Sequence, residues 1–135
     1  MTERVSDFLD RRILASDAFS DADPTPFLEI LTENDPATYL SPRGELISGA
    51  ANVRAATIAA AERFDKGGTN HIEVLGIAVA RGALSGYWFG EQFTEMHVKG
   101  SDILVPMNFF IAEEIRVEDE DGLWRTARRY TIPRQ

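Results

Sequence analysis

The chain has 135 residues, of which 44% are apolar and 27% charged, so it can bury a core, and we expect one domain over residues 1–135. It contains no cysteine, which excludes disulfides, thiolate nucleophiles and cysteine-ligated metal sites. A formal net charge of −8 disfavours a nucleic-acid partner, and no apolar run reaches the length of a membrane span. The first residues lack the apolar stretch of a signal peptide, so we expect a cytoplasmic protein.

The first half of the chain predicts helices separated by proline-containing breaks. Apolar residues recur at three- and four-residue spacings across residues 5–20, which indicates an amphipathic helix. Thr25-Pro26 is typical of an N-cap with proline in the first turn, and it opens a short helix that ends near Leu31. Gly49 precedes a third helix, which we expect to end at Lys66-Gly67-Gly68.

The rest of the chain favours strands. A short strand is predicted over residues 37–41, and four β-rich runs follow at 71–80, 83–98, 103–117 and 123–132. The segments between the four runs have the length of hairpin turns, so these runs should form an antiparallel meander. Two runs far exceed the usual strand length of about five or six residues and have to bend. Gly86, Gly90 and Pro106 are the predicted bend or bulge positions.

Two motifs resemble one known family. The segment 36–44, Pro-Ala-Thr-Tyr-Leu-Ser-Pro-Arg-Gly, with Gly49 opening a helix, resembles the first strand and third helix of ketosteroid-isomerase-like proteins. Residues 121–125, Asp-Gly-Leu-Trp-Arg, and the strand to Tyr130 resemble the final hairpin of the SnoaL-like branch. Together with the order of elements, they make the chain similar to the nuclear-transport-factor-2-like superfamily, as a single SnoaL-like domain over residues 1–135.

The resemblance implies an α+β fold. In it, three N-terminal helices pack in a strongly curved, mixed but mainly antiparallel sheet, a cystatin-like cone-shaped half barrel. It also implies a pocket for a small apolar ligand inside the cone, and a dimer through the outer face of the sheet. The superfamily contains enzymes and non-catalytic binders, so the fold does not select a function.

The catalytic groups of the isomerases are only partly matched. Ser41 stands where those enzymes have the aspartate base, and a serine hydroxyl is not a base at neutral pH without an activator. No tyrosine lies in the first helix, where Arg11 or Arg12 is nearest to the matching place. The third group, a neutral carboxylic acid, corresponds to Glu113, or to Glu114 if the turn shifts the register. We therefore do not expect a standard ketosteroid isomerase.

Glu113 is nevertheless a candidate acid. Glu113 shares strand parity with Met107, Phe109 and Ile111. If the turn over residues 99–102 is centred between Lys99 and Gly100, Glu113 also lies on the face of Trp88 and Gln92. Such neighbours would raise the pKa of the carboxyl and allow it to donate a hydrogen bond. The alternative is that Glu113 begins the acidic run ending at Asp121, on a solvated hairpin tip.

His71 is a second candidate, again by resemblance. The superfamily's dehydratases and dehydrohalogenases use a histidine near the start of the meander, held by an aspartate from the end of the first helix. His71 lies at that place, and Asp21 is the candidate partner, with Asp17 or Asp23 as alternatives. His71 could equally be an exposed residue at the start of a strand, and His97 is expected at the surface. The two histidines have no nearby partner ligands, so no metal site and no cofactor are expected.

Two further predictions concern the strand faces. The second and third long runs are apolar on both faces, which favours a homodimer formed through the outer sheet face, with a monomer as the alternative. The C-terminal arginines are predicted to lie on a solvated or carboxylate-paired sheet edge: Arg125, Arg128, Arg129 and Arg134.

The leading interpretation is a protein that binds a small apolar or aromatic ligand. Its pocket is expected to be lined by Tyr39, Ser41, Trp88, Gln92, Met107, Phe109, Ile111 and Glu113, with His71 near the mouth. The first alternative is a cofactor-free lyase or isomerase that uses His71 with an aspartate, or Glu113 as acid. The second is a non-catalytic dimerisation module.

Overall fold

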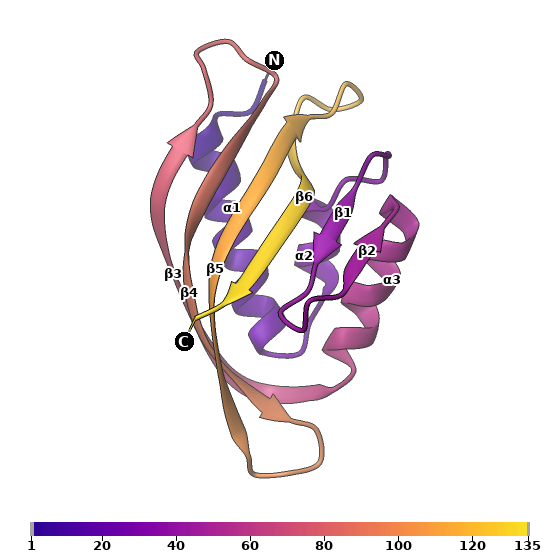
Figure 1. Ribbon diagram of the computed structural model, residues 1–135, viewed down its shortest axis with the longest axis vertical. Helices are drawn as coiled ribbons and strands as arrows, with labels where there is room; N and C mark the ends of the chain where they lie inside the picture. The colour runs from indigo at the N-terminus through magenta and orange to yellow at the C-terminus, as the bar shows by residue number, and fades with distance from the viewer. Residues whose placement is uncertain (1, 135) are drawn as a thin grey trace.

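The computed structural model describes residues 2–134, and its class is α+β with one six-stranded mixed sheet (Figure 1). The elements in chain order are α1 (Val5–Ser20), α2 (Thr25–Ile30), β1 (Thr38–Leu40), β2 (Leu46–Ser48), α3 (Ala50–Ala61), β3 (Phe64–Ala78), β4 (Ser85–Val98), β5 (Leu104–Val117) and β6 (Trp124–Pro133). Among these described residues, no helix is long and apolar enough to cross a membrane.

The strand order is β2-β1-β6-β5-β4-β3. The predicted antiparallel meander of β3 to β6 is confirmed, because each of these strands pairs antiparallel with the next. The short strand β1 pairs parallel with β6, which places Tyr39 directly beside Arg129. Strand β6 therefore lies inside the sheet, between β1 and β5, and not at its edge.

The helices pack against one side of the sheet, called the inner face below. Helix α1 contacts β3, β4 and β6, while α3 lies against β1 and β2. In Figure 1 the long strands β3 and β4 curve past α1 toward α3. Helix α1 directs Phe8 and Leu9 into the core, where they meet the fully buried Trp88 and Ile115 of the inner face. The 3.6-residue period of α1 and the two-residue period of the strands thus build one shared core.

The end of the third helix differs from the prediction. It ends at Ala61, and Phe64 already belongs to β3, so Gly67 and Gly68 lie inside a strand and not at a helix cap. The reason is a close approach to the end of α1. A Cβ on Gly68 would lie 2.2 Å from the Ser20 carbonyl oxygen, so only glycine fits at this contact.

The bulges also differ from the predicted positions. Register shifts occur on β3, between Asp65 and Thr69 and again at Leu75, and on β6 at Ala127. Of the three predicted positions, Gly86, Gly90 and Pro106, only Gly90 lies beside a shift, paired with the residue before Leu75. The extra residue at Ala127 changes which β6 side chains face the helices, and this affects the candidate site.

Candidate functional site

A cavity of about 370 Å³ lies between the helices and the inner face of the sheet. Five of the residues expected in the pocket line it: Tyr39, Ser41, Gln92, Met107 and Phe109. Helix α3 contributes a small-residue wall that includes Thr57 and Ala60, and Phe19 and Phe27 come from α1 and α2. Trp88, Ile111 and Glu113 share the inner face but are buried in the core beside the cavity and are not part of its wall.

Glu113 is the most buried polar group of this region, with no exposed surface. Its Oε2 accepts from Arg12, with Nη2 at 2.8 Å and Nε at 2.9 Å. Its Oε1 accepts from the indole Nε1 of Trp88 and the hydroxyl of Thr126, each at 2.9 Å. Arg12 in turn donates through Nη1 to Ser16, which also lines the cavity. The carboxylate is thus a fully paired acceptor next to the cavity.

These contacts correct the expected chemistry of Glu113. Burial by itself raises the pKa of the Glu113 carboxyl, but the charge and hydrogen bonds of Arg12 outweigh it, with help from Arg129 and Thr126. The net effect holds its pKa below the ordinary value. Glu113 is therefore an ionised acceptor, neither a neutral acid in an apolar pocket nor part of a solvated hairpin tip. The predicted apolar neighbours are present, but the prediction did not include Arg12.

Arg129 is a further charged group of the cavity wall, and it is more buried than the exposed Arg43, Glu45 and Arg63, which also line the cavity. Its guanidinium carbon lies 4.1 Å from the ring centroid of Tyr39 and 4.6 Å from that of Phe27, two further cavity residues. Burial lowers the pKa of Arg129, Tyr39 opposes that shift, and the nearby charge of Arg12 adds to it. Within residues 2–134 the Nε of Arg129 has no hydrogen-bond partner.

The prediction that the four C-terminal arginines lie on a sheet edge is wrong, because β6 lies between β1 and β5. Three of these arginines do pair with carboxylates: Arg125 with Asp121 at 2.7 Å, Arg128 with Glu114 at 3.2 Å and Arg134 with Glu91 at 2.9 Å. The Nε of Arg128 also lacks a hydrogen bond, but a carboxylate lies beside it. Arg129 differs because the bulge at Ala127 turns it to the inner face, opposite Glu113.

Comparison with known proteins shows which fold this architecture matches. No family model matches the sequence, and no curated protein matches it. Solved structures match almost the whole chain. A ketosteroid isomerase-like protein from Erwinia carotovora atroseptica is 16% identical with a TM-score of 0.75, over 100% of this chain and 99% of its own. A nuclear transport factor 2-like superfamily protein from Salmonella enterica is 12% identical with a TM-score of 0.78, over 97% and 89%.

This chain has the nuclear-transport-factor-2-like fold. A third match is a candidate calcium/calmodulin-dependent protein kinase type II association domain from Thiobacillus denitrificans, 15% identical, with a TM-score of 0.75, covering 100% of this chain and 98% of its own. Identities this low establish the shared fold and leave the activity open.

Within this nuclear-transport-factor-2-like fold, the structure does not bring His71 and Asp21 together. The His71 side chain is 67% exposed, lies 3.6 Å from the Glu73 carboxylate and stacks on Phe93. Asp21 accepts a hydrogen bond from the backbone N–H of Gly67. His71 therefore lies on the outer face and away from the cavity wall.

The inward position at the start of the meander belongs to the preceding residue. The Asn70 amide donates to Asp17 of α1 at 3.0 Å and accepts from Gln92 at 2.7 Å. The aspartate contact expected from the end of the first helix therefore exists, but its partner is an amide, which cannot serve as a general base.

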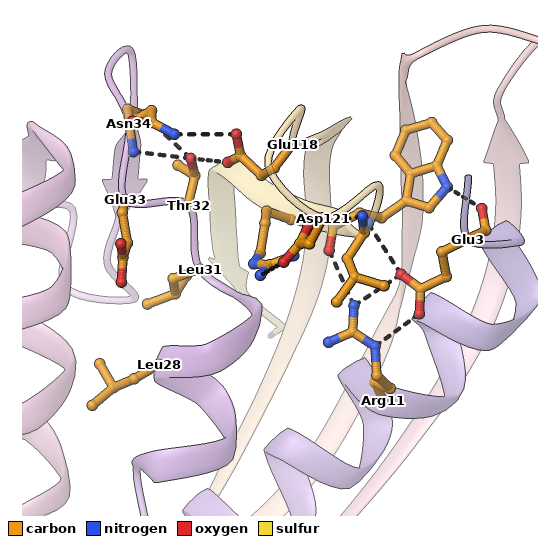
Figure 2. A network of polar contacts seen from close by, with 12 residues as sticks. Glu3, Arg11, Leu28, Leu31, Thr32, Glu33, Asn34, Glu118 and Asp121 are labelled. Atoms are coloured by element: carbon orange, nitrogen blue, oxygen red, sulfur yellow. Dashed lines mark hydrogen bonds and ion pairs between the residues drawn. The ribbon is translucent and has the colours of Figure 1, made fainter. Parts of the chain in front are cut away.

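A second group of polar contacts lies at the hairpin between β5 and β6 (Figure 2). Arg11 donates to Glu3 at 2.8 Å, and the Trp124 indole donates to the Glu3 carbonyl at 2.8 Å. Nearby, Thr32 and the Asn34 amide donate to Glu118. These contacts tie the N-terminal segment and the end of α2 to the last hairpin, so these carboxylates have structural partners. Among the described residues, no group of three histidine, aspartate or glutamate side chains is arranged to hold a metal ion.

Proposed function

We propose that this protein binds a small apolar or aromatic molecule in the cavity between its helices and the inner sheet face. The observation that carries the proposal is the cavity of about 370 Å³. An apolar cavity of about 150 Å³ holds one benzene, and ligand sites begin near 300 Å³. A cone-shaped curvature of the sheet, as the fold resemblance implies, would enclose a molecule of about two rings here.

The composition of the wall supports an apolar ligand. Phe19, Phe27 and Phe109 supply aromatic surface, and the two methionines Met96 and Met107 can adapt to the shape of a ligand. Most polar wall groups already have partners within the protein. The hydroxyl of Thr94 donates to the Thr69 carbonyl, that of Thr131 donates to the Leu40 carbonyl, and Gln92 donates to Asn70. These groups leave few donors free for a ligand.

Two observations favour binding over the lyase or isomerase alternative. A general acid must hold a proton, and the pKa of Glu113 is lowered, not raised. Ser41 lines the cavity at the position of the isomerase base, but its oxygen accepts from the backbone N–H of Glu45 at 3.2 Å, and among the described residues no side-chain base is hydrogen-bonded to it. We therefore place no catalytic step in this cavity.

The proposal is tested by placing a larger side chain of helix α3 in the cavity. Ala60 lines the cavity and Ala55 lies exposed on the same helix, so Ala60→Phe and Ala55→Phe form a matched pair. Titrating both variants with 1-naphthol and indole, followed by NMR shifts, should show binding to wild type and Ala55→Phe and its loss in Ala60→Phe. Equal binding to the two variants would place the ligand outside the cavity and contradict the proposal.

We further propose that the chain forms a homodimer through the outer face of the sheet. Four exposed apolar side chains there, called the outer patch below, are Tyr87, Phe89, Phe110 and Ile132, exposed by 41–55%. Phe110 and Ile132 lie directly opposite each other on neighbouring strands, so the patch is continuous. Exposed contiguous apolar surface of this kind marks interfaces. Sedimentation equilibrium tests the proposal.

A further inference from the structure

Apart from the exposed Arg43, Glu45 and Arg63 of its wall, the charged groups beside the cavity carry an unbalanced charge. Arg12 and Glu113 are 1% and 0% exposed, and they neutralise each other through contacts of 2.8 and 2.9 Å. The remaining acceptor capacity of Glu113 is taken by Trp88 and Thr126. Arg129 then contributes one further positive charge, which no carboxylate of residues 2–134 approaches within ion-pair distance.

The immediate surroundings of Arg129 attract a cation, but no carboxylate of residues 2–134 forms an ion pair with it. The rings of Tyr39 and Phe27 pack against the guanidinium, with centroids at 4.1 and 4.6 Å. Contacts of this type stabilise the charge through the ring quadrupole and give the guanidinium no anionic acceptor. The Nε of Arg129 is accordingly buried without a partner.

This arrangement is unusual in a protein of net charge −8. Carboxylates are plentiful, and they pair with Arg125, Arg128 and Arg134 on the same strand or just beyond its end. A partly buried cation without a counter-ion costs free energy unless something pairs with it. The only large space that adjoins Arg129 in the described structure is the cavity, which is where a ligand would sit.

We propose that the ligand of the cavity is a small organic monocarboxylate, with its apolar body against the aromatic wall and its carboxylate paired with Arg129. This inference rests on the proposed function of the cavity and adds the chemical class of the ligand. The planar fork of a guanidinium matches a carboxylate, which can accept two parallel hydrogen bonds. A phosphate dianion fits less well, because it would bring two charges and three oxygens to the single partly buried arginine of the wall, while Arg43 and Arg63 are exposed and Glu45 adds a negative charge.

The test compares an acid with its neutral isostere. Wild-type protein is titrated at pH 7 with 4-phenylbutanoate and with 4-phenylbutanamide by calorimetry. We expect the acid to bind about 10- to 100-fold more tightly, the range of a hydrogen bond to a charged group. Arg129→Gln should abolish this preference while the amide keeps its affinity. Arg128→Gln is the matched control, because it makes the same change on the adjacent residue, which faces the outside and pairs with Glu114.

The outcomes separate the two proposals. If acid and amide bind wild type equally and Ala60→Phe excludes both, the cavity binds ligands but the carboxylate inference is overturned. If neither probe binds, both proposals fail for this ligand class. A structural role for Arg129 is tested without ligand by urea unfolding. Arg129→Gln also removes the contacts with the Tyr39 and Phe27 rings, so we expect a loss somewhat above that of Arg128→Gln. A loss as large as that of a broken buried ion pair would show that Arg129 is already paired within the core, and would overturn the inference.

Discussion

Substitution of Glu113 by glutamine tests the charge state on which the interpretation of the site depends. The change keeps the size of the side chain and removes its charge. Arg12, 1% exposed, would then be a buried cation without its counter-ion, and the new amide nitrogen would face a donor from Arg12, Trp88 or Thr126. Removal of one partner of a buried ion pair typically costs about 3–5 kcal/mol.

This loss is large compared with the stability of a domain, which is typically about 5–15 kcal/mol. At about 2.1 cal/mol/K per residue, the unfolding entropy of 135 residues converts 1 kcal/mol into roughly 3.5 °C of Tm. Glu113→Gln should therefore lower Tm by roughly 10–18 °C.

Urea unfolding at pH 7, followed by circular dichroism, measures the effect. Glu114→Gln is the matched control, because Glu114 faces outward and its pair with Arg128 at 3.2 Å is partly exposed, so we expect a loss below about 1 kcal/mol. The double variant Arg12→Met with Glu113→Leu should recover most of the loss, since replacement of a whole buried pair by apolar groups is often neutral. A loss below about 1 kcal/mol for Glu113→Gln would refute an ionised, paired Glu113 and would reopen its role as an acid.

The pH dependence follows from the same pair. Burial raises the pKa of Glu113 but Arg12 lowers it further, so the folded pKa lies below the unfolded value of about 4.3. Glu113 therefore contributes its full stability above pH 4.3, and this contribution is lost as the pH falls through the lower, folded pKa. Between pH 6 and pH 3 the urea midpoint of wild type should fall more steeply than that of Glu113→Gln. Parallel curves would contradict the lowered pKa.

Two further outcomes concern the surface. Phe89→Glu in the outer patch should convert the proposed dimer into a monomer in sedimentation equilibrium. Leu14→Glu is the control, because Leu14 is 64% exposed on α1, and it should leave the dimer intact. A monomeric wild-type protein would refute the dimer. Both ring nitrogens of His97 face backbone carbonyls, of Lys66 and of Ser101, which favours the imidazolium and raises the pKa of His97. NMR titration should therefore place its midpoint above about 6.5, and a lower midpoint would contradict the geometry.

The face of Glu113 could be predicted from the sequence because it depends on parity alone. The structure pairs Trp88 with Glu113 and Gln92 with Phe109, so these four residues share the inner face as predicted. The turn is centred one residue later than assumed, between Gly100 and Ser101. A shift of the turn centre by one residue moves the pairing of the two strands by two residues, so each side chain keeps its face of the sheet. The helix over residues 5–20 was equally accessible, because its period extends over four turns.

Arg12 was missed although the sequence carried a signal. It lies four residues after Phe8 and three after Leu9, on the stripe that α1 buries. An arginine on an apolar stripe requires a buried carboxylate, and Glu113 was already a candidate for that partner. Arg129 carried no such signal. Counted from Trp124, a regular strand would turn Arg128 inward, and the bulge at Ala127 shifts that place to the next residue.

The predicted face of His71 was also wrong by one residue along the strand. The period of a strand places neighbouring side chains on opposite faces, so the inward contact with α1 belongs to Asn70, and His71 stacks on Phe93 outside. An error of one residue thus placed the imidazole of His71 where the structure has the amide of Asn70. Where chemistry depends on one side chain of a strand, the sequence gives the element with much more certainty than the face.

Arg12 decides which chemistry this cavity can support. In the family that the sequence resembles, the carboxyl at the position of Glu113 is useful when it is neutral and can donate a hydrogen bond. Here the guanidinium of Arg12 lies 2.8 Å away and holds the pKa of the carboxyl below its ordinary value. The carboxylate hydrogen-bonds Arg12, Trp88 and Thr126 and forms no ion pair with Arg129, although the two charges stabilise each other at longer range. An ionised Glu113 holds no proton to donate, and Arg129 remains a cation at the cavity wall, which supports our proposal of anion binding over proton transfer.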